Sequence, residues 1–72
     1  MPKLPVVSGV ELVKVLVKEL GFRILRREGS HITLAKNGVR VTVPLHREID
    51  RGLLNGILKH VGMSREEFLK RL

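Results

Sequence analysis

The spacing of apolar residues along the chain predicts a helix near the N-terminus. In "SGVELVKVLVKELG", residues 8–21, valines and leucines recur at intervals of three and four, the period of one helix face. Ser8 and Glu11 have the spacing of a capping box at the start of this helix, and Gly21 is suited to its end. The preceding residues, 1–7, include two prolines and are expected to form an extended arm.

After this helix the pattern of apolar and polar residues alternates, which predicts β-strands. We expect three strands, at residues 22–27, 31–36 and 39–43. The first two are joined by a turn at residues 28–30, and the last two by a two-residue hairpin turn at Asn37-Gly38.

Two more helices are expected after the strands. Following a loop, Asp50 can cap a helix over residues 51–61, and Ser64 with Glu67 has the spacing of a second capping box before a short helix at 65–72. The element order predicts an α+β fold in a single domain that spans the whole chain. We expect a three-stranded antiparallel sheet with two helices on one face, in the order α-β-β-β-α, and a short extra C-terminal helix.

The Asn37-Gly38 turn predicts which residues of its two strands face each other. It pairs the apolar residues Ile32 with Val43 and Leu34 with Val41, so this face of the sheet is expected to meet the helices. The other face then carries the pairs His31–Pro44, Thr33–Thr42 and Ala35–Arg40.

The register of the first strand depends on the turn at residues 28–30. A three-residue turn would place Arg27 opposite His31, so that Arg23, Leu25 and Arg27 share the helix-free face. His31 is therefore expected to face solvent beside arginines, at a cross-strand separation of about 5 Å between Cβ atoms.

Charge and composition narrow the classes of function. The 72 residues contain 14 Lys and Arg against seven Asp and Glu, a net charge of +7, which favours a polyanionic partner such as nucleic acid. Two phenylalanines are the only aromatic residues, which excludes a stacking platform for unpaired bases. The absence of cysteine excludes disulfides, and no apolar run has the length of a membrane span, so a cytoplasmic protein is expected.

His31 is the leading candidate for catalysis. Imidazole exchanges protons near neutral pH and can act as a general base toward a ribose 2′-hydroxyl, while arginines stabilise charge on the phosphoryl oxygens. Gly29 permits close approach of a backbone, and Ser30 can donate a hydrogen bond to a phosphate. The alternative is a solvated histidine at a strand end with no catalytic role.

The other two histidines have different expected roles. His46 follows Pro44 and is expected near His31, where it could protonate the leaving oxygen, bind phosphate, or hold the loop through a bond to the backbone. His60 lies in the last turn of the second helix, where a structural role is expected. No tight spacing of metal ligands is present, so neither a metal nor a cofactor is expected.

Several motifs together resemble the HicA toxin family, also called YcfA-like. They are Gly21-Phe22, "REGSH" at residues 27–31, "VTVPLH" at 41–46, and the segment 52–70 that includes "GMSREEF". The resemblance implies a fold like that of double-stranded-RNA-binding domains. It also implies an mRNA interferase of a type II toxin–antitoxin module, which cleaves RNA without a metal through His31. An acidic HicB-type antitoxin would then cover the His31 face.

One position departs from the family pattern. Many relatives carry a second histidine directly after the first, where this chain has Ile32. The predicted register turns Ile32 toward the core, so its presence need not abolish activity.

The sequence hypothesis is therefore a slow endoribonuclease. His31 transfers the proton, and the RNA-binding residues are Gly29, Ser30, Arg27, Arg40, Arg23 and His46. Two alternatives stay open: a non-catalytic double-stranded-RNA-binding module, and a protein-interaction module with a basic sheet face. The RNA-binding module needs a basic cluster at the start of the second helix, where acidic residues dilute Arg47 and Arg51.

Overall fold

The computed structural model describes residues 6–72, so most of the predicted arm at residues 1–7 lies outside the described part. The predicted α+β fold class is confirmed, and the three strands form one antiparallel sheet. The elements in chain order are α1 (Gly9–Leu20), β1 (Arg23–Glu28), β2 (His31–Lys36), β3 (Val39–Pro44), α2 (Arg51–Val61) and α3 (Arg65–Arg71).

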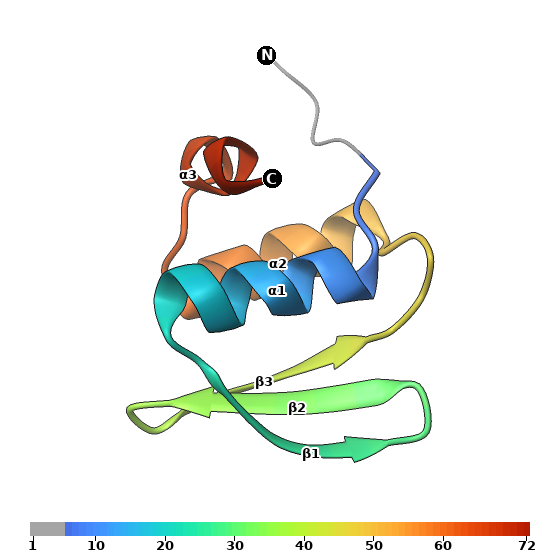
Figure 1. Cartoon of the computed structure of the whole chain (residues 1–72). Coiled ribbons are helices and arrows are strands. Elements are labelled where there is room, and N and C mark those ends of the chain that lie inside the picture. The colour runs from blue at the N-terminus through green and yellow to red at the C-terminus, as the bar shows by residue number, and fades with distance from the viewer. Residues whose placement is uncertain (1–5) are drawn as a thin grey trace.

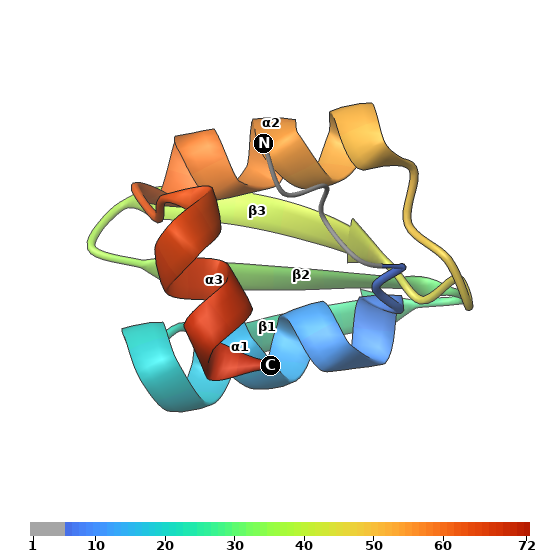
Figure 2. The same ribbon diagram turned by 90° about the horizontal axis from the view of Figure 1, so that it is seen from above.

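The molecule has a layer of helices over one face of the sheet. Helices α1 and α2 lie side by side above the strands, and α3 crosses over them on the side away from the sheet (Figure 1, Figure 2). The strand order is β1-β2-β3, so β2 is central. Within residues 6–72, no helix covers the other face of the sheet, which we call the open face (Figure 1).

Helix α1 begins and ends as the sequence predicts. The Ser8 hydroxyl accepts a hydrogen bond from the Glu11 N–H at 3.1 Å, and the Glu11 carboxylate accepts one from the Ser8 N–H at 3.0 Å. Gly21 ends the helix in the left-handed region, at φ +76°. Leu12 and Leu16, one turn apart on the same face of the helix, are fully buried in the core.

Helix α3 is joined to the core by Phe68, which is fully buried. Ser64 caps this helix by accepting from the Glu67 N–H, as predicted. The predicted capping box is only half formed, however, because the Glu67 carboxylate accepts from the Ser64 hydroxyl instead of the Ser64 backbone. The side chain of Arg71 also forms an ion pair with Glu19 of α1, at 3.1 Å.

The predicted register of β2 and β3 is confirmed at every pair. Asn37 and Gly38 both have positive φ, +47° and +83°, as a type I′ hairpin turn requires. The side chains of Leu34, Val41 and Val43 are buried beneath the helices. The paired residues are His31–Pro44, Ile32–Val43, Thr33–Thr42, Leu34–Val41, Ala35–Arg40 and Lys36–Val39.

The predicted register of β1 is right at its start and wrong at its end. Arg23 faces Ala35, as expected, but the pairing shifts by one residue at a β-bulge around Leu25. Beyond the bulge the turn contains two residues instead of three, so Glu28, not Arg27, faces His31. Because a shift of one residue reverses the face of every side chain, Arg27 points to the helix side and Arg26 to the open face. The remaining pairs are Ile24–Leu34, Arg26–Thr33 and Arg27–Ile32.

Candidate active site on the open face

The open face presents its side chains in three rows that run across the strands. Successive rows are two residues apart along β2, a separation of about 7 Å. From the β1–β2 turn toward the Asn37-Gly38 turn, the rows are Glu28–His31–Pro44, Arg26–Thr33–Thr42 and Arg23–Ala35–Arg40.

His31 is exposed and stands in the first row, so the predicted orientation of this side chain is confirmed. The predicted proximity of His46 is also confirmed. The centroids of the two imidazole rings are 6.3 Å apart, and the rings are nearly perpendicular, at 71°. Two groups able to give and take protons therefore lie next to each other at one end of the open face.

Backbone contacts hold His46 in this place. The loop after β3 is tied to the β1–β2 turn by the Leu45 N–H, which donates to the Ser30 carbonyl at 2.6 Å. The His46 carbonyl accepts from the Gly9 N–H at the start of α1, at 2.9 Å. In the described residues 6–72, the loop is held by the backbone of His46 and not by its imidazole ring. The ring is therefore available for chemistry.

Gly9 is essential to this arrangement because α1 starts in contact with the end of β3. A Cβ atom built on Gly9 would lie 2.0 Å from the Pro44 carbonyl oxygen and 2.7 Å from the Leu45 Cα. Only glycine allows the backbones to approach so closely. The sequence pattern at residues 8–21 did not predict this role for Gly9.

Gly29 and Ser30 form the turn that leads into His31. Gly29 has φ +57°, which favours glycine, and an added Cβ there would meet no atom within 4 Å. Within the chain itself, the requirement for glycine is therefore conformational. Ser30 is exposed beside His31, so its hydroxyl is accessible to a ligand.

Arg27 is not where the sequence placed it relative to His31. Arg27 lies on the helix side, where its Nε donates to the Gly29 carbonyl at 3.2 Å and so supports the turn. Its predicted position opposite His31 is wrong. The direct neighbours of His31 are instead Glu28 and Pro44.

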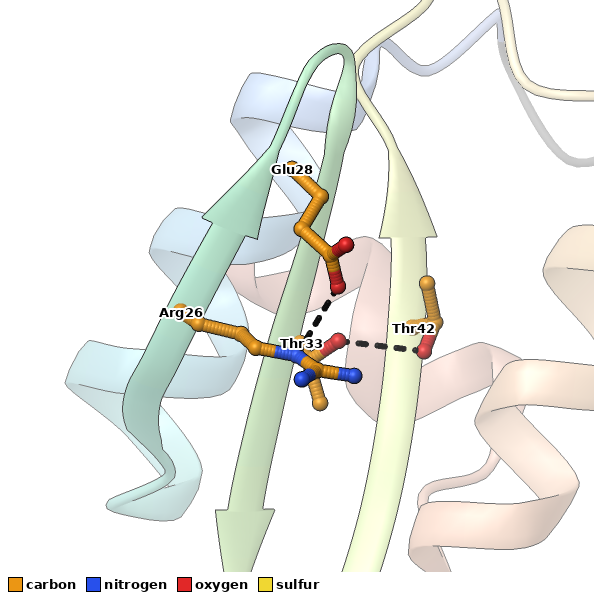
Figure 3. A network of polar contacts seen from close by, with 4 residues as sticks. All are labelled: Arg26, Glu28, Thr33 and Thr42. Carbon is orange, nitrogen blue, oxygen red and sulfur yellow. Dashed lines mark hydrogen bonds and ion pairs between the residues drawn. The ribbon is translucent and has the colours of Figure 1, made fainter.

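The middle row, together with Glu28 of the first row, carries polar contacts that the sequence did not predict (Figure 3). The Nε of Arg26 forms an ion pair with Glu28 at 3.0 Å, and the hydroxyls of Thr33 and Thr42 lie 3.4 Å apart. The available signal was the Gly29-Ser30 dipeptide: as a two-residue turn it would have placed Glu28 opposite His31 and Arg26 opposite Thr33.

The third row confirms the predicted face of Arg23 and Arg40. These two arginines flank the small side chain of Ala35, at about 13 Å along the strand from His31. A hollow of about 380 Å³ opens beside this row and is lined by Gly21, Arg23, Ala35, Lys36, Asn37 and Gly38. The positive charge at this end of the sheet is thus separated from the histidine pair by the middle row.

His60 has the structural role that its position predicts. Its Nε2 lies 3.0 Å from the Arg40 carbonyl oxygen. Because a carbonyl can only accept, the ring nitrogen carries the hydrogen and donates. This bond ties the end of α2 to the outer edge of β3.

The start of α2 is occupied by its own cap. The Asp50 carboxylate accepts from the N–H groups of Gly52 and Leu53, at 3.0 and 3.3 Å. An acidic group at this helix end opposes the binding of phosphate there. This finding weighs against the non-catalytic double-stranded-RNA-binding module.

Residues 6–72 contain neither a cluster of metal ligands nor a membrane-spanning helix. In this part of the chain, histidine and acidic side chains form no group of three that could hold a metal ion. None of its helices has the length and apolar character needed to cross a membrane.

Comparison with known families identifies the class of protein. Residues 9–63 match the family described as "HicA toxin of bacterial toxin-antitoxin". The match covers more than half of the 72 residues, so the chain belongs to the HicA toxin family. Membership of this family implies a toxin that has an antitoxin as its partner.

The matched region contains α1, the whole sheet and α2, and with them both histidines of the pair. It ends at Met63, before α3, so the resemblance noted in "GMSREEF" stays a prediction beyond that residue. Neither the search of curated proteins nor the search of solved structures found a match.

Proposed function

We propose that this toxin is a metal-independent endoribonuclease that cleaves mRNA in the cytoplasm, with His31 as its proton-transfer residue. The observation that carries the proposal is the pair of imidazole rings, His31 and His46, 6.3 Å apart on an exposed sheet face. General acid–base cleavage of RNA needs one group to remove a proton and another to supply one. The pair provides both.

In the proposed reaction, the His31 imidazole removes the proton from a ribose 2′-hydroxyl. The 2′-oxygen then forms a bond to the adjacent phosphorus, and the bond from phosphorus to the 5′-oxygen of the next nucleotide breaks. His46 gives its proton to this leaving oxygen. The products are a 2′,3′-cyclic phosphate and a 5′-hydroxyl, and the two histidines have exchanged protonation states.

The residues around the pair are proposed to bind RNA. Gly29 and Ser30 shape the approach to His31, and the exposed Ser30 hydroxyl can donate to a phosphate oxygen. Arg23 and Arg40 offer a second point of contact for the RNA backbone, two rows away. We also propose that the antitoxin is an acidic, HicB-type protein that covers this face, since the chain carries a net charge of +7.

The proposal is tested by incubating the purified chain with a single-stranded RNA in the presence of a chelator. Two matched oligonucleotides serve as controls: the same sequence as DNA and as 2′-O-methyl RNA. We expect cleavage of the RNA alone, with 2′,3′-cyclic phosphate ends, because only RNA has the attacking hydroxyl.

Cleavage of the 2′-O-methyl strand, or loss of all RNA cleavage on chelation, would contradict this mechanism. Binding of duplex RNA without any cleavage would instead support the non-catalytic double-stranded-RNA-binding module. Binding of an acidic protein partner, with no affinity for either RNA, would support the protein-interaction module.

A further inference from the structure

The middle row of the open face has the chemistry of an anion-binding site. Arg26 is the cross-strand partner of Thr33, and its side chain extends toward the central strand, where the hydroxyls of Thr33 and Thr42 face each other (Figure 3). The three side chains come from three different strands and lie in direct cross-strand register. They are one row from His31, about 7 Å along β2.

Hydrogen-bonding capacity remains free in this row. The guanidinium of Arg26 has five N–H donors, and its Nε is engaged by Glu28 at 3.0 Å, which leaves the donors on the terminal nitrogens. Of the two threonine hydroxyls, only one donates in the 3.4 Å contact between them, so the other O–H remains free to donate. Charged and neutral donors are therefore present in the same row of the open face.

Glu28 contacts only one edge of the Arg26 guanidinium, at Nε. The side chains of Arg26 and Glu28 are 68% and 70% exposed, so their ion pair is weak and adapts readily to a ligand. A phosphate can take the free edge of the guanidinium while Nε keeps its carboxylate partner.

We propose that Arg26, Thr33 and Thr42 bind the phosphodiester of single-stranded RNA next to the nucleotide on which His31 acts. This proposal rests on the proposed function and adds the residues that hold the reacting phosphate. Arg26, which faces Thr33, has the phosphate-binding role that the sequence predicted for Arg27. It also supplies the positive charge that stabilises negative charge developing on the phosphoryl oxygens.

The chain offers a matched pair of variants for the test, Arg26→Ala and Arg27→Ala. Both remove one positive charge from adjacent positions of β1, but only Arg26 is on the face of His31. Binding is measured by fluorescence anisotropy with a 2′-O-methyl RNA, which is not cleaved, over a range of salt concentrations. Single-turnover cleavage of the unmodified RNA and thermal melting are measured on the same proteins.

We expect Arg26→Ala to weaken binding by about tenfold or more, as for loss of a hydrogen bond to a charged group. The slope of the logarithm of the binding constant against the logarithm of salt concentration should become less steep by about 0.7. This is the value for one phosphate contact with a single strand. Arg27→Ala should change affinity by less than about threefold and keep the salt dependence of the wild type. Replacing both threonines, Thr33→Val with Thr42→Val, should weaken binding while leaving the melting temperature within a few degrees.

Equal losses in the two arginine variants would overturn the phosphate site, because charge alone would then explain both. Weaker binding of the antitoxin by Arg26→Ala, with RNA binding unchanged, would overturn it as well. In either case wild-type cleavage would leave the proposed function standing. If the wild type neither binds nor cleaves RNA, the proposed function itself fails.

Discussion

The imidazole rings of His31 and His46 lie with their centroids 6.3 Å apart, although 15 positions separate them in the sequence. His31 begins β2, and His46 follows the end of β3. The hydrogen bond from the Leu45 N–H to the Ser30 carbonyl brings their two segments together. A proton acceptor and a proton donor therefore lie within reach of the same phosphodiester.

The first prediction concerns His46. His46→Ala should lower the single-turnover rate of RNA cleavage by about a hundredfold, within the range for loss of one general acid or base. The melting temperature should stay the same, because the loop is held by the backbone carbonyl of His46 and not by its ring. An RNA in which sulfur replaces the 5′-oxygen at the cleavage site has a better leaving group that needs no general acid. With this substrate, His46→Ala should recover much of the cleavage rate.

The double variant His31→Ala with His46→Ala provides the control for this prediction. Two residues that act on the same step have effects that do not add. The double variant should therefore be about as slow as His31→Ala alone. A rate for His46→Ala equal to that of the wild type, on both substrates, would remove His46 from the mechanism.

The second prediction concerns Gly9. Gly9→Ala places a Cβ 2.0 Å from the Pro44 carbonyl oxygen, so α1 and the end of β3 must separate. We expect a loss of about 1–3 kcal/mol in the free energy of unfolding, together with slower cleavage, because the same contact positions His46. Urea denaturation and single-turnover kinetics measure the two effects.

Gly56→Ala is the matched control for Gly9→Ala. Gly56 lies inside α2, and an added Cβ there meets nothing within 4 Å. This variant should be more stable than the wild type by about 1 kcal/mol, since alanine favours the helix interior. A Gly9→Ala protein as stable as the wild type would show that this tight contact does not exist in solution.

The third prediction concerns α3, which lies outside the part matched to the family. Phe68 is fully buried, so Phe68→Ala should lower the free energy of unfolding by about 3–5 kcal/mol. Such a loss is a large part of the total stability of a small domain. Leu72→Ala, at a site 50% exposed, should change stability by less than about 0.5 kcal/mol. Similar urea midpoints for these two variants would mean that α3 is not packed on the core.

Local sequence signals were sufficient for the elements and for one of the two strand registers. The Asn37-Gly38 turn leaves little freedom, because both residues must adopt positive φ, and it correctly predicted all pairs of β2 with β3. These pairs predict that the side chains of His31 and Arg40 lie on the open face, where the structure places them.

The end of β1 could not be predicted in the same way. Arg26 and Arg27 are adjacent and chemically identical, so no alternation of apolar and polar residues indicates which one faces the open side. The bulge at Leu25 adds one residue to β1 without a clear sequence signal, and it reverses the faces of the residues that follow. The Gly29-Ser30 dipeptide was the one local signal for the neighbours of His31, and the sequence alone did not decide between a two-residue and a three-residue turn.

The most direct test of the central claim compares wild type with His31→Ala in single-turnover cleavage of a single-stranded RNA, with thermal melting of both proteins. Because His31 is exposed, its replacement should leave the melting temperature unchanged. The account predicts a rate at least about a hundredfold lower for the variant. A folded His31→Ala protein that cleaves at the wild-type rate would contradict it.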